Sequence, residues 1–265
     1  MILIAINSIT PGAGTTTVAA NLMVAMQRLG RHAVLIDGDP RNQVRLHFGM
    51  PASDPHGWWP HSGEGLQFSD AAYVAAPPLD AAKISAHFVP FGDSASVLES
   101  DATYEYLVRH PSAFQEALQH SAIPESAVVF VTLSEALVPL QYQVLAAADF
   151  AFGVITPNPL WQLQLQRYLR STAAARLREQ QPLHVLLNQC QPELTLNNDM
   201  AQLIQAELPA DMAVPLTLHH DQHVPEALAL QQLVENYQSN AQFANEIDAL
   251  ALWLETQLLE RGNAT

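Results

Sequence analysis

A short apolar strand that runs through a glycine-rich loop into a helix opens the chain, and it limits the folds that the chain can adopt. The predicted strand covers residues 1–7, the predicted helix covers 16–29, and the loop between them is Thr10-Pro11-Gly12-Ala13-Gly14-Thr15-Thr16-Thr17. A loop of this kind points several backbone N–H groups at one place, where the helix dipole adds partial positive charge. The opening therefore predicts a phosphate-binding loop at the first turn of an α/β fold.

This loop lacks the lysine that the standard phosphate-binding motif carries. That motif ends in Gly-Lys-Ser/Thr, with the lysine on the β- and γ-phosphates and the hydroxyl on Mg²⁺. Here Gly14 is followed by Thr15 and Thr16, and the only lysine among the 265 residues is Lys83. The backbone cradle and the metal hydroxyl of Thr16 are kept, whereas the positive charge is lost.

Composition narrows the partners that the chain can have. A net charge of −15 disfavours nucleic acid and an anionic membrane surface, because both attract clustered lysine and arginine. The single cysteine, Cys190, allows no internal disulfide. We see no signal peptide before the first strand and no apolar run of about 20 residues. The prediction is a cytoplasmic protein that reaches a membrane only through a partner.

Apolar strand-like runs alternate with helical stretches along the chain. Because their hydrophobicity is continuous, the runs predict strands buried on both faces, as in a parallel sheet between helices. We therefore predict a doubly wound α/β fold with a mostly parallel sheet and helices on both faces. The whole chain, 1–265, is expected to form one domain with an irregular surface excursion at about 51–80. The further strands are expected at 33–36, 84–89, 127–131, 151–155, 183–187 and 212–216, and the further helices at 103–119, 139–148, 159–179, 197–207 and 239–258.

Ligands of such folds bind at the carboxyl ends of the strands, so the residues after each strand are the candidate site. Asp37 and Asp39 follow the second strand, in the turn Asp37-Gly38-Asp39-Pro40. One carboxylate can hold Mg²⁺ through water, and the other can orient a water molecule that attacks a phosphate. The alternative is a polar turn whose aspartates cap a helix. Opposite a phosphate-binding loop we favour the first interpretation.

The strand that ends at Val131 should deliver a second carboxylate beside the metal, and it delivers Thr132 instead. A hydroxyl carries no charge, so the site loses a negative ligand here just as it loses a positive one at Thr15. Glu135 is the candidate replacement. Both changes argue against efficient hydrolysis.

Two later positions are candidates for contact with a nucleotide base. Asn188 follows the predicted strand 183–187, where a side-chain amide can read the donor and acceptor edge of a base. Pro215 begins the other loop expected to pass the base. The alternatives are a turn role for Asn188 and simple packing for Pro215.

Three further features have competing interpretations. The run His219-His220-Asp221-Gln222-His223 resembles a metal cluster, but it precedes a helical pattern at 225–228, so we favour helix capping. Trp58 and Trp59 are either a partner-binding anchor or part of the packing of the excursion. The amphipathic run 247–259 has an acidic polar face, which suits core packing and not lipid.

Together, the loop 10–17, the turn 37–40, Asn188 and the segment 214–227 resemble the deviant phosphate-loop ATPases of the ParA/MinD class. That class usually has lysine at both of the positions that Thr10 and Thr15 occupy here. Within it, the chain is most similar to the BcsQ family, also called YhjQ, of bacterial cellulose-synthesis operons. The likenesses to this family lie at 14–17, 44–48, 57–58, 89–92 and 220–221.

The resemblance implies ATP or ADP with Mg²⁺ as cofactors, and it implies a role for each matching residue. The backbone of Gly12, Ala13, Gly14, Thr15 and Thr16, followed by Thr17, would hold the phosphates. Thr16 and Asp37 would serve Mg²⁺, Asp39 would position water, and Asn188 would contact the base. The family also implies a nucleotide-dependent homodimer that serves the inner-membrane cellulose synthase complex, with small regulatory subunits as partners.

Four functions remain open at this point. The first is a nucleotide-binding assembly or regulatory subunit with weak or absent hydrolysis, which the missing charges at Thr10, Thr15 and Thr132 favour. The second is a working ATPase that drives intracellular positioning, and the third is a nucleotide-free scaffold. A small-molecule kinase or ligase ranks last, because phosphoryl transfer depends on positive charge. Arg41 and Arg45 are the candidates to replace the missing lysines.

Overall fold

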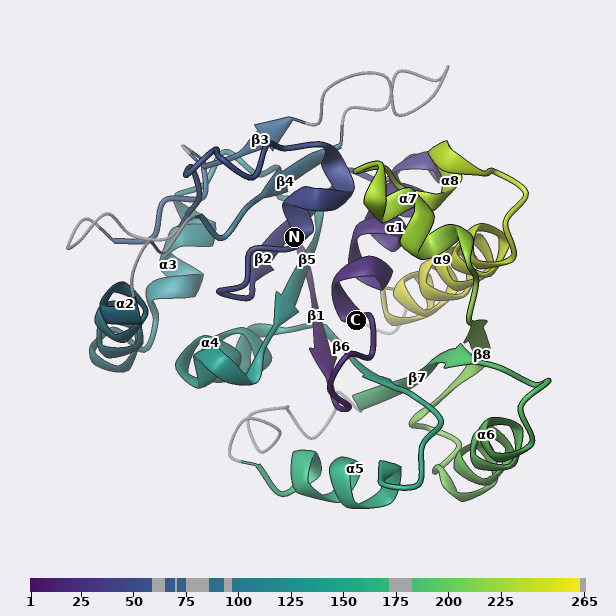
Figure 1. The fold of residues 1–265 in the computed structure, drawn as a ribbon. Helices are drawn as coiled ribbons and strands as arrows, with labels where there is room; N and C mark the ends of the chain where they lie inside the picture. The colour runs from purple at the N-terminus through teal and green to yellow at the C-terminus, as the bar shows by residue number, and fades with distance from the viewer. Residues whose placement is uncertain (59–64, 70, 75–85, 93–96, 172–182, 263–265) are drawn as a thin grey trace.

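The computed structural model describes residues 1–58, 65–69, 71–74, 86–92, 97–171 and 183–262. These residues form an eight-stranded sheet in the order β3-β4-β2-β5-β1-β6-β7-β8 (Figure 1). All neighbouring strands are parallel except β3 and β4, so the prediction of a mostly parallel sheet is confirmed. The strands are β1 Ile2–Ser8, β2 Ala33–Gly38, β3 Tyr73–Val74, β4 His87–Val89, β5 Val128–Leu133, β6 Phe150–Ile155, β7 Leu183–Cys190 and β8 Ala213–His219.

Helices cover both faces of this sheet (Figure 1). One face packs against α1 Thr15–Arg28, η1 Val44–Phe48, α7 His223–Ala229, α8 Val234–Tyr237 and α9 Gln242–Gly262. The other packs against α2 Val97–Arg109, α3 Ala113–Gln119, η2 Glu135–Leu137, α4 Val138–Ala147, α5 Trp161–Leu169 and α6 Thr195–Glu207.

Strand β1 shows why the hydrophobic runs are continuous. Its side chains alternate between the two cores, with Ile4 and Ile6 in one cluster and Leu3 and Ala5 in the other. Both faces are therefore removed from water, which is why the middle of the strand is apolar at consecutive positions. The amphipathic run 247–259 packs on the first face, where Leu250 and Leu254 are fully buried, as predicted.

Several predicted boundaries are wrong, for local reasons. The single helix expected at 103–119 is two helices, α2 and α3, because Pro111 lies between them and a proline interrupts helical hydrogen bonding. Strands β7 and β8 extend to residues 190 and 219, beyond the predicted ends at 187 and 216. The ends of these strands contain polar residues, so the hydrophobic pattern did not indicate that the strands continue. Part of the predicted helix 159–179 and of the predicted strand 84–89 lies outside the described residues.

The excursion at 51–80 contributes to the sheet and to its core. Its residues 73–74 form β3, which pairs antiparallel with β4. Trp58 is 2% exposed, its ring meets Phe68 and Phe91 edge to face, and its Nε1–H donates to the carbonyl of Asp37 at 2.6 Å. Packing is thus the correct interpretation of Trp58, while Trp59 lies outside the described residues.

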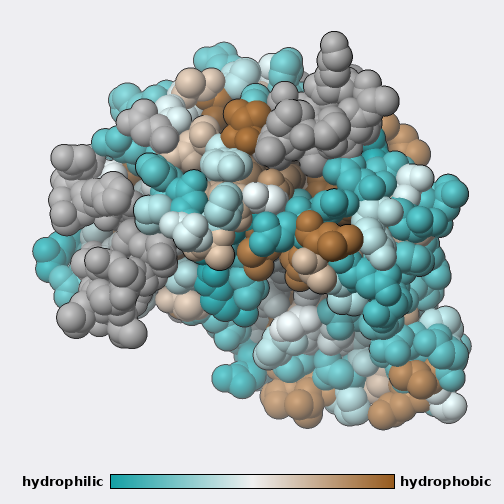
Figure 2. All heavy atoms as spheres, turned by 45° about the horizontal axis from the view of Figure 1, so that its top comes forward, coloured by the Kyte–Doolittle hydropathy of each residue, from teal (hydrophilic) through white to brown (hydrophobic). Residues whose placement is uncertain are grey.

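The surface of the molecule is largely hydrophilic. Figure 2 shows one face on which hydrophobic residues form small, separate groups. In the part of the chain that the structure describes, no helix has the length and hydrophobicity needed to cross a bilayer.

Candidate functional site

The loop between β1 and α1 lines a small cavity at the carboxyl edge of the sheet. The cavity has a volume of about 70 Å³, and we call it the loop cavity. Its position follows from the topology, because β1 lies between β5 and β6 and all three strands end at this edge. The lining residues are Ser8, Gly12, Ala13, Gly14, Thr15, Thr16, Asp39, Arg41, Thr132 and Leu133.

Two amide side chains from the end of β7 fix the backbone of the loop. Asn188 Nδ2 donates to the carbonyl of Ala13 at 2.7 Å, and Gln189 Nε2 donates to the carbonyl of Gly12 at 2.8 Å. In a trans peptide the C=O and the N–H point in opposite directions. Because Asn188 holds the Ala13 carbonyl, the N–H of Gly14 in the same peptide points away from Asn188. The sequence did not indicate either contact, and base contact by Asn188 stays a prediction.

Gly14 is required at the junction of the loop and α1. Its φ of +79° lies in the left-handed region, and a Cβ there would lie 2.7 Å from Asn188 Nδ2. Helix α1 begins directly after it, and the first helical hydrogen bond runs from the Val18 N–H to the Gly14 carbonyl. The N–H groups of residues 15–17 precede that bond, so the helix itself does not satisfy them.

Thr15 and Thr16, which take the lysine and metal positions of the standard motif, both line the loop cavity. The Thr15 hydroxyl is buried and has no hydrogen-bond partner among the described residues. Buried hydroxyls nearly always have a partner, so an orphaned one at a cavity wall calls for a ligand. The neighbouring Thr17 faces away, and its hydroxyl lies 3.4 Å from Nε2 of the buried His47. Burial lowers the pKa of His47 to about 4.

Thr10, at the other lysine position, is turned into the protein. It is 1% exposed, and its Oγ1 accepts a hydrogen bond from the Thr156 N–H at 3.0 Å. The same Oγ1 lies 3.2 Å from the Thr156 hydroxyl. Thr10 thus ties the loop to the end of β6.

Asp37 is buried beneath the turn and is absent from the lining of the loop cavity. Its Oδ1 accepts from the Asp39 N–H at 3.0 Å and from the Thr132 hydroxyl at 2.9 Å, while its Oδ2 accepts from the Val44 N–H at 3.1 Å. Burial raises its pKa to about 7, although these three bonds oppose the shift. Because its oxygens are already engaged, Asp37 holds the turn together in this state, and a metal role for it stays a prediction.

Thr132 reaches Asp37 because the register of β2 and β5 pairs the two residues directly. Its Oγ1 also accepts from the Gly38 N–H at 3.2 Å. An uncharged residue here gives the buried Asp37 a donor instead of a second carboxylate. Glu135 lies exposed in η2 and is absent from the lining of the loop cavity, so it does not replace the missing aspartate.

Asp39 lines the loop cavity and is paired with Arg41. The guanidinium Nε lies 2.9 Å from Oδ2 and 3.1 Å from Oδ1, and Nη2 completes the fork. This bond raises the pKa of Arg41. Arg45 points elsewhere, because its Nη1 donates to the Asp54 carbonyl at 2.8 Å and its Nη2 to the Ala52 carbonyl at 3.1 Å.

A second cavity of about 240 Å³ adjoins the loop, and we call it the side cavity. Gly14 lines both cavities, so the two are neighbours. Pro215 lines neither of them: it lies exposed within β8, four residues before the end of that strand. The side cavity is lined by Gly14, Thr17, Asn188, Gln189, His219, His220, Asp221, Val224, Pro225 and Phe243.

The histidine run 219–223 leads from the end of β8 to the first residue of α7. Asp221 Oδ1 accepts from the His223 N–H at 2.9 Å, and its Oδ2 accepts from the Phe243 N–H at 3.0 Å, so one carboxylate serves the first turns of α7 and α9. His219 pairs with Glu246 at 2.6 Å. Among the described residues, no group of three or more His, Cys, Asp or Glu side chains can hold a metal ion. The capping interpretation is correct for Asp221, because its carboxylate bonds first-turn N–H groups of two helices.

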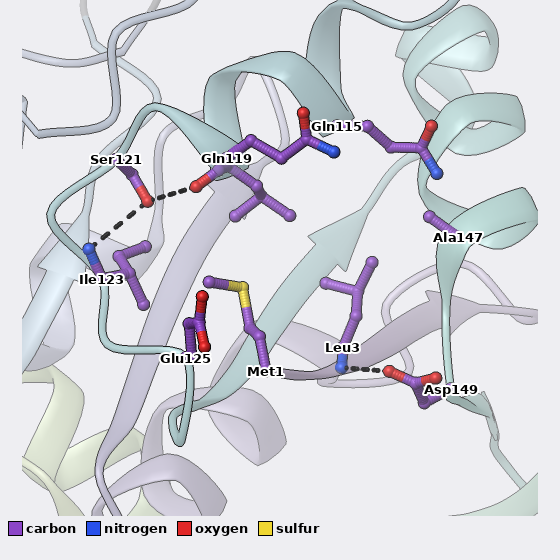
Figure 3. Close-up of a pocket in the computed structure, with 10 residues that line it drawn as sticks. Met1, Leu3, Gln115, Gln119, Ser121, Ile123, Glu125, Ala147 and Asp149 are labelled. Atoms are coloured by element: carbon purple, nitrogen blue, oxygen red, sulfur yellow. Dashed lines mark hydrogen bonds between the residues drawn. The ribbon is translucent and has the colours of Figure 1, made fainter.

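A wider groove lies at the opposite, amino edge of the sheet (Figure 3). It has a volume of about 650 Å³ and is lined by residues at or just before the starts of β1, β5 and β6, together with residues of α3. The carboxylates of Glu125 and Asp149 face it, and the described residues of its lining include no lysine, arginine or histidine. Asp149 Oδ2 is engaged by the Leu3 N–H at 2.9 Å. This groove therefore suits a phosphate poorly, despite its size.

The loop cavity is the better match for a phosphate, and it matches Mg²⁺ less completely. The orphaned Thr15 hydroxyl and the N-terminus of α1 are donors for phosphate oxygens. Mg²⁺ prefers oxygen ligands and is commonly held by one or two protein groups together with phosphates. The cavity offers the Thr16 hydroxyl and Asp39, but Asp39 is already paired with Arg41.

Comparison with known protein families decides where the chain belongs. The family model for Cellulose biosynthesis protein BcsQ matches residues 1–254. The chain belongs to the BcsQ family. Cellulose biosynthesis protein BcsQ of Escherichia coli (strain K12) is 24% identical over 254 residues, which cover 96% of this chain and 94% of that protein. The BcsQ of Salmonella typhimurium is 23% identical over 255 residues, with the same coverage of each chain.

Solved structures show that this BcsQ-family chain has the fold of the MinD proteins. The septum site-determining protein MinD of Pyrococcus horikoshii, complexed with Mg-ADP, has a TM-score of 0.70 at 17% identity, and the match covers 97% of each chain. Cobyrinic acid a,c-diamide synthase of Mycobacterium smegmatis, with bound ADP and magnesium, has a TM-score of 0.67 at 16% identity, covering 96% and 94%. The predicted fold class and family resemblance are confirmed.

Proposed function

We propose that this BcsQ-family chain binds ATP or ADP with Mg²⁺ at the loop and side cavities and acts as an assembly or regulatory subunit of a cellulose synthase complex. The observation that carries the proposal is the orphaned Thr15 hydroxyl on the wall of a cavity whose backbone two amides hold in place. An unsatisfied buried donor and the first turn of α1 together suit an anion. The side cavity, which shares Gly14, is the place for the nucleoside.

Slow or absent hydrolysis of ATP follows from the charged side chains that the site lacks. Thr132 supplies no carboxylate beside the metal, and its hydroxyl donates to Asp37. Thr10 and Thr15 carry no positive charge for the leaving phosphates, which efficient phosphoryl transfer needs. We therefore favour binding over turnover. Thr16 is the residue that would hold Mg²⁺ together with the nucleotide phosphates, which supply the rest of its oxygen ligands.

The role in cellulose synthesis is proposed from the family, and the remaining features from the resemblance. The Escherichia coli and Salmonella typhimurium relatives are described as cellulose biosynthesis proteins. A nucleotide-dependent homodimer would present the same surface twice to regulatory subunits of the synthase. A cytoplasmic location and recruitment to the inner membrane through those subunits complete the proposal.

Native mass spectrometry and calorimetry with ATP and Mg²⁺ test the proposal together. We expect one nucleotide per chain, a shift from monomer to dimer on binding, and phosphate release close to that of buffer. Absence of binding at millimolar ATP would leave a nucleotide-free scaffold. Fast phosphate release that disappears in Asp39→Ala would establish a working ATPase instead. A gel shift at low salt checks that nucleic acid does not bind.

A further inference from the structure

Arg41 is a positively charged residue at the wall of the loop cavity. Among the described residues that line this cavity, Arg41 alone has a positively charged side chain. Both lysine positions of the loop hold threonine, and Thr10 is buried against Thr156. A triphosphate brings about four negative charges, and a small cavity that excludes water makes uncompensated charge costly. The charge balance of the site therefore depends on Arg41.

The turn that carries Arg41 is fixed on both sides, whereas its side chain is open to solvent. On one side the Asp39 N–H bonds Asp37, and on the other Asn42 donates to the Gly92 carbonyl at 3.0 Å and accepts from the Phe91 N–H at 3.1 Å. The Arg41 side chain itself is 63% exposed. A change of partner thus requires only side-chain rotation and leaves the backbone in place.

Asp39 and a phosphate compete for the same fork of donors. The guanidinium of arginine matches the two oxygens of a carboxylate or of a phosphate equally well in shape. The pair is only half exposed, since the Arg41 side chain is 63% and the Asp39 side chain 6% exposed, so giving it up has a cost that the phosphates must outweigh. A nucleotide phosphate in the adjoining cavity carries more negative charge than one carboxylate. We therefore expect the Arg41 guanidinium to bind the phosphate in preference to Asp39.

We propose that Arg41 replaces the missing lysines of the loop: it turns from Asp39 to the phosphates of the bound nucleotide, within the same chain. This inference rests on the proposed function, because it concerns how the same site holds its ligand. It also assigns a second state to Asp39, which is paired without nucleotide and released when nucleotide binds. Arg45, four residues later, has no such role, since it holds the carbonyls of Ala52 and Asp54.

Calorimetric titration of the full chain with ATP and Mg²⁺ tests the inference, with Arg45→Gln as the matched control. Arg41→Gln should weaken ATP binding about 10- to 100-fold, the range expected for loss of a charge-assisted hydrogen bond. Arg45→Gln should stay within about twofold of the wild type. Circular dichroism of Arg41→Gln should match the wild type, whereas its melting temperature should fall, because the buried Asp39 carboxylate loses its cationic partner.

The double variant Asp39→Asn/Arg41→Gln separates direct contact from simple neutralisation of Asp39. If Arg41 contacts phosphate, the double variant still binds ATP at least tenfold more weakly than the Asp39→Asn single variant. Equal affinity of these two proteins would show that Arg41 only neutralises Asp39, and it would overturn the inference. Equal affinity of the wild type and Arg41→Gln would also overturn it. Failure of the wild type to bind ATP at all would instead refute the proposed function.

Discussion

The substitution Asn188→Asp tests whether the amide of Asn188 holds the phosphate-binding loop. The side chain is 4% exposed, and its Nδ2 lies 2.7 Å from the Ala13 carbonyl oxygen. Aspartate has the same shape but, when ionised, places a second acceptor against that oxygen. We therefore expect both partners to lose their hydrogen bond without any exchange for water.

The magnitude follows from the burial of both groups. An unsatisfied buried carbonyl costs about 1–3 kcal/mol, and the burial of a carboxylate adds to this, so we expect a loss of about 2–4 kcal/mol at pH 8. Burial raises the pKa of the new carboxyl above its unfolded value, so the folded state binds its proton more tightly. A protonated carboxyl can again donate to Ala13. The loss should therefore shrink to about 1 kcal/mol at pH 5.

Urea unfolding followed by tryptophan fluorescence, at pH 5 and pH 8, measures this difference. Asn240→Asp is the matched control, because it adds the same charge at an exposed position and should change stability by less than about 0.5 kcal/mol. Asn188→Ala removes the donor without adding a titrating group, so its loss should be the same at both pH values. Wild-type stability of Asn188→Asp at pH 8, or an equal loss at both pH values, would refute the reasoning.

Three further predictions concern the same edge of the sheet. Gly14→Ala should lower stability by at least about 1 kcal/mol and abolish ATP binding in calorimetry, whereas Gly30→Ala, also at positive φ but with open space around its Cβ, should keep binding. Trp58→Phe should cost about 1–3 kcal/mol in urea unfolding, because the buried Asp37 carbonyl loses its donor. Wild-type stability after either change would contradict these contacts. Asp37→Asn should gain a few kcal/mol relative to the wild type as pH rises from about 4 to 7, and then level off, because the raised pKa of Asp37 makes the wild type lose stability across that window. A constant difference in melting across this pH range would show that Asp37 does not titrate there.

The hydrophobic pattern and the turn residues predicted the architecture, because both depend only on residues that are near one another in the sequence. The continuous apolar runs of β1, β5 and β6 required burial on both faces, and Gly12 and Gly14 marked the loop before α1. The predicted boundaries were wrong where the hydrophobic pattern was too short to show a period or was interrupted by a proline. Pro111 divided a helical pattern into two helices, and β3 is too short to show a period.

The candidate site could be placed from sequence, but the partner of each side chain could not. Asn188 was expected to read a base, which stays a prediction, and nothing in the sequence indicated that its Nδ2 bonds a carbonyl 175 residues away in the chain. Pro215 was expected beside the ligand, yet β8 continues past it and brings His219 and His220 to the side cavity instead. Such pairings depend on strand order and register, which no local pattern encodes.

Sequence alone thus determined that this chain forms a parallel α/β sheet with a phosphate-type loop at its carboxyl edge and no lysine in that loop. Only the tertiary structure decided which charges remain available there. The pairing of β2 with β5 gives the buried Asp37 the hydroxyl of Thr132, and the turn after β2 places Arg41 on Asp39 at the cavity wall. The physical reason is that hydrogen-bond geometry and burial, which set the state of each carboxylate, exist only once strands distant in sequence are neighbours.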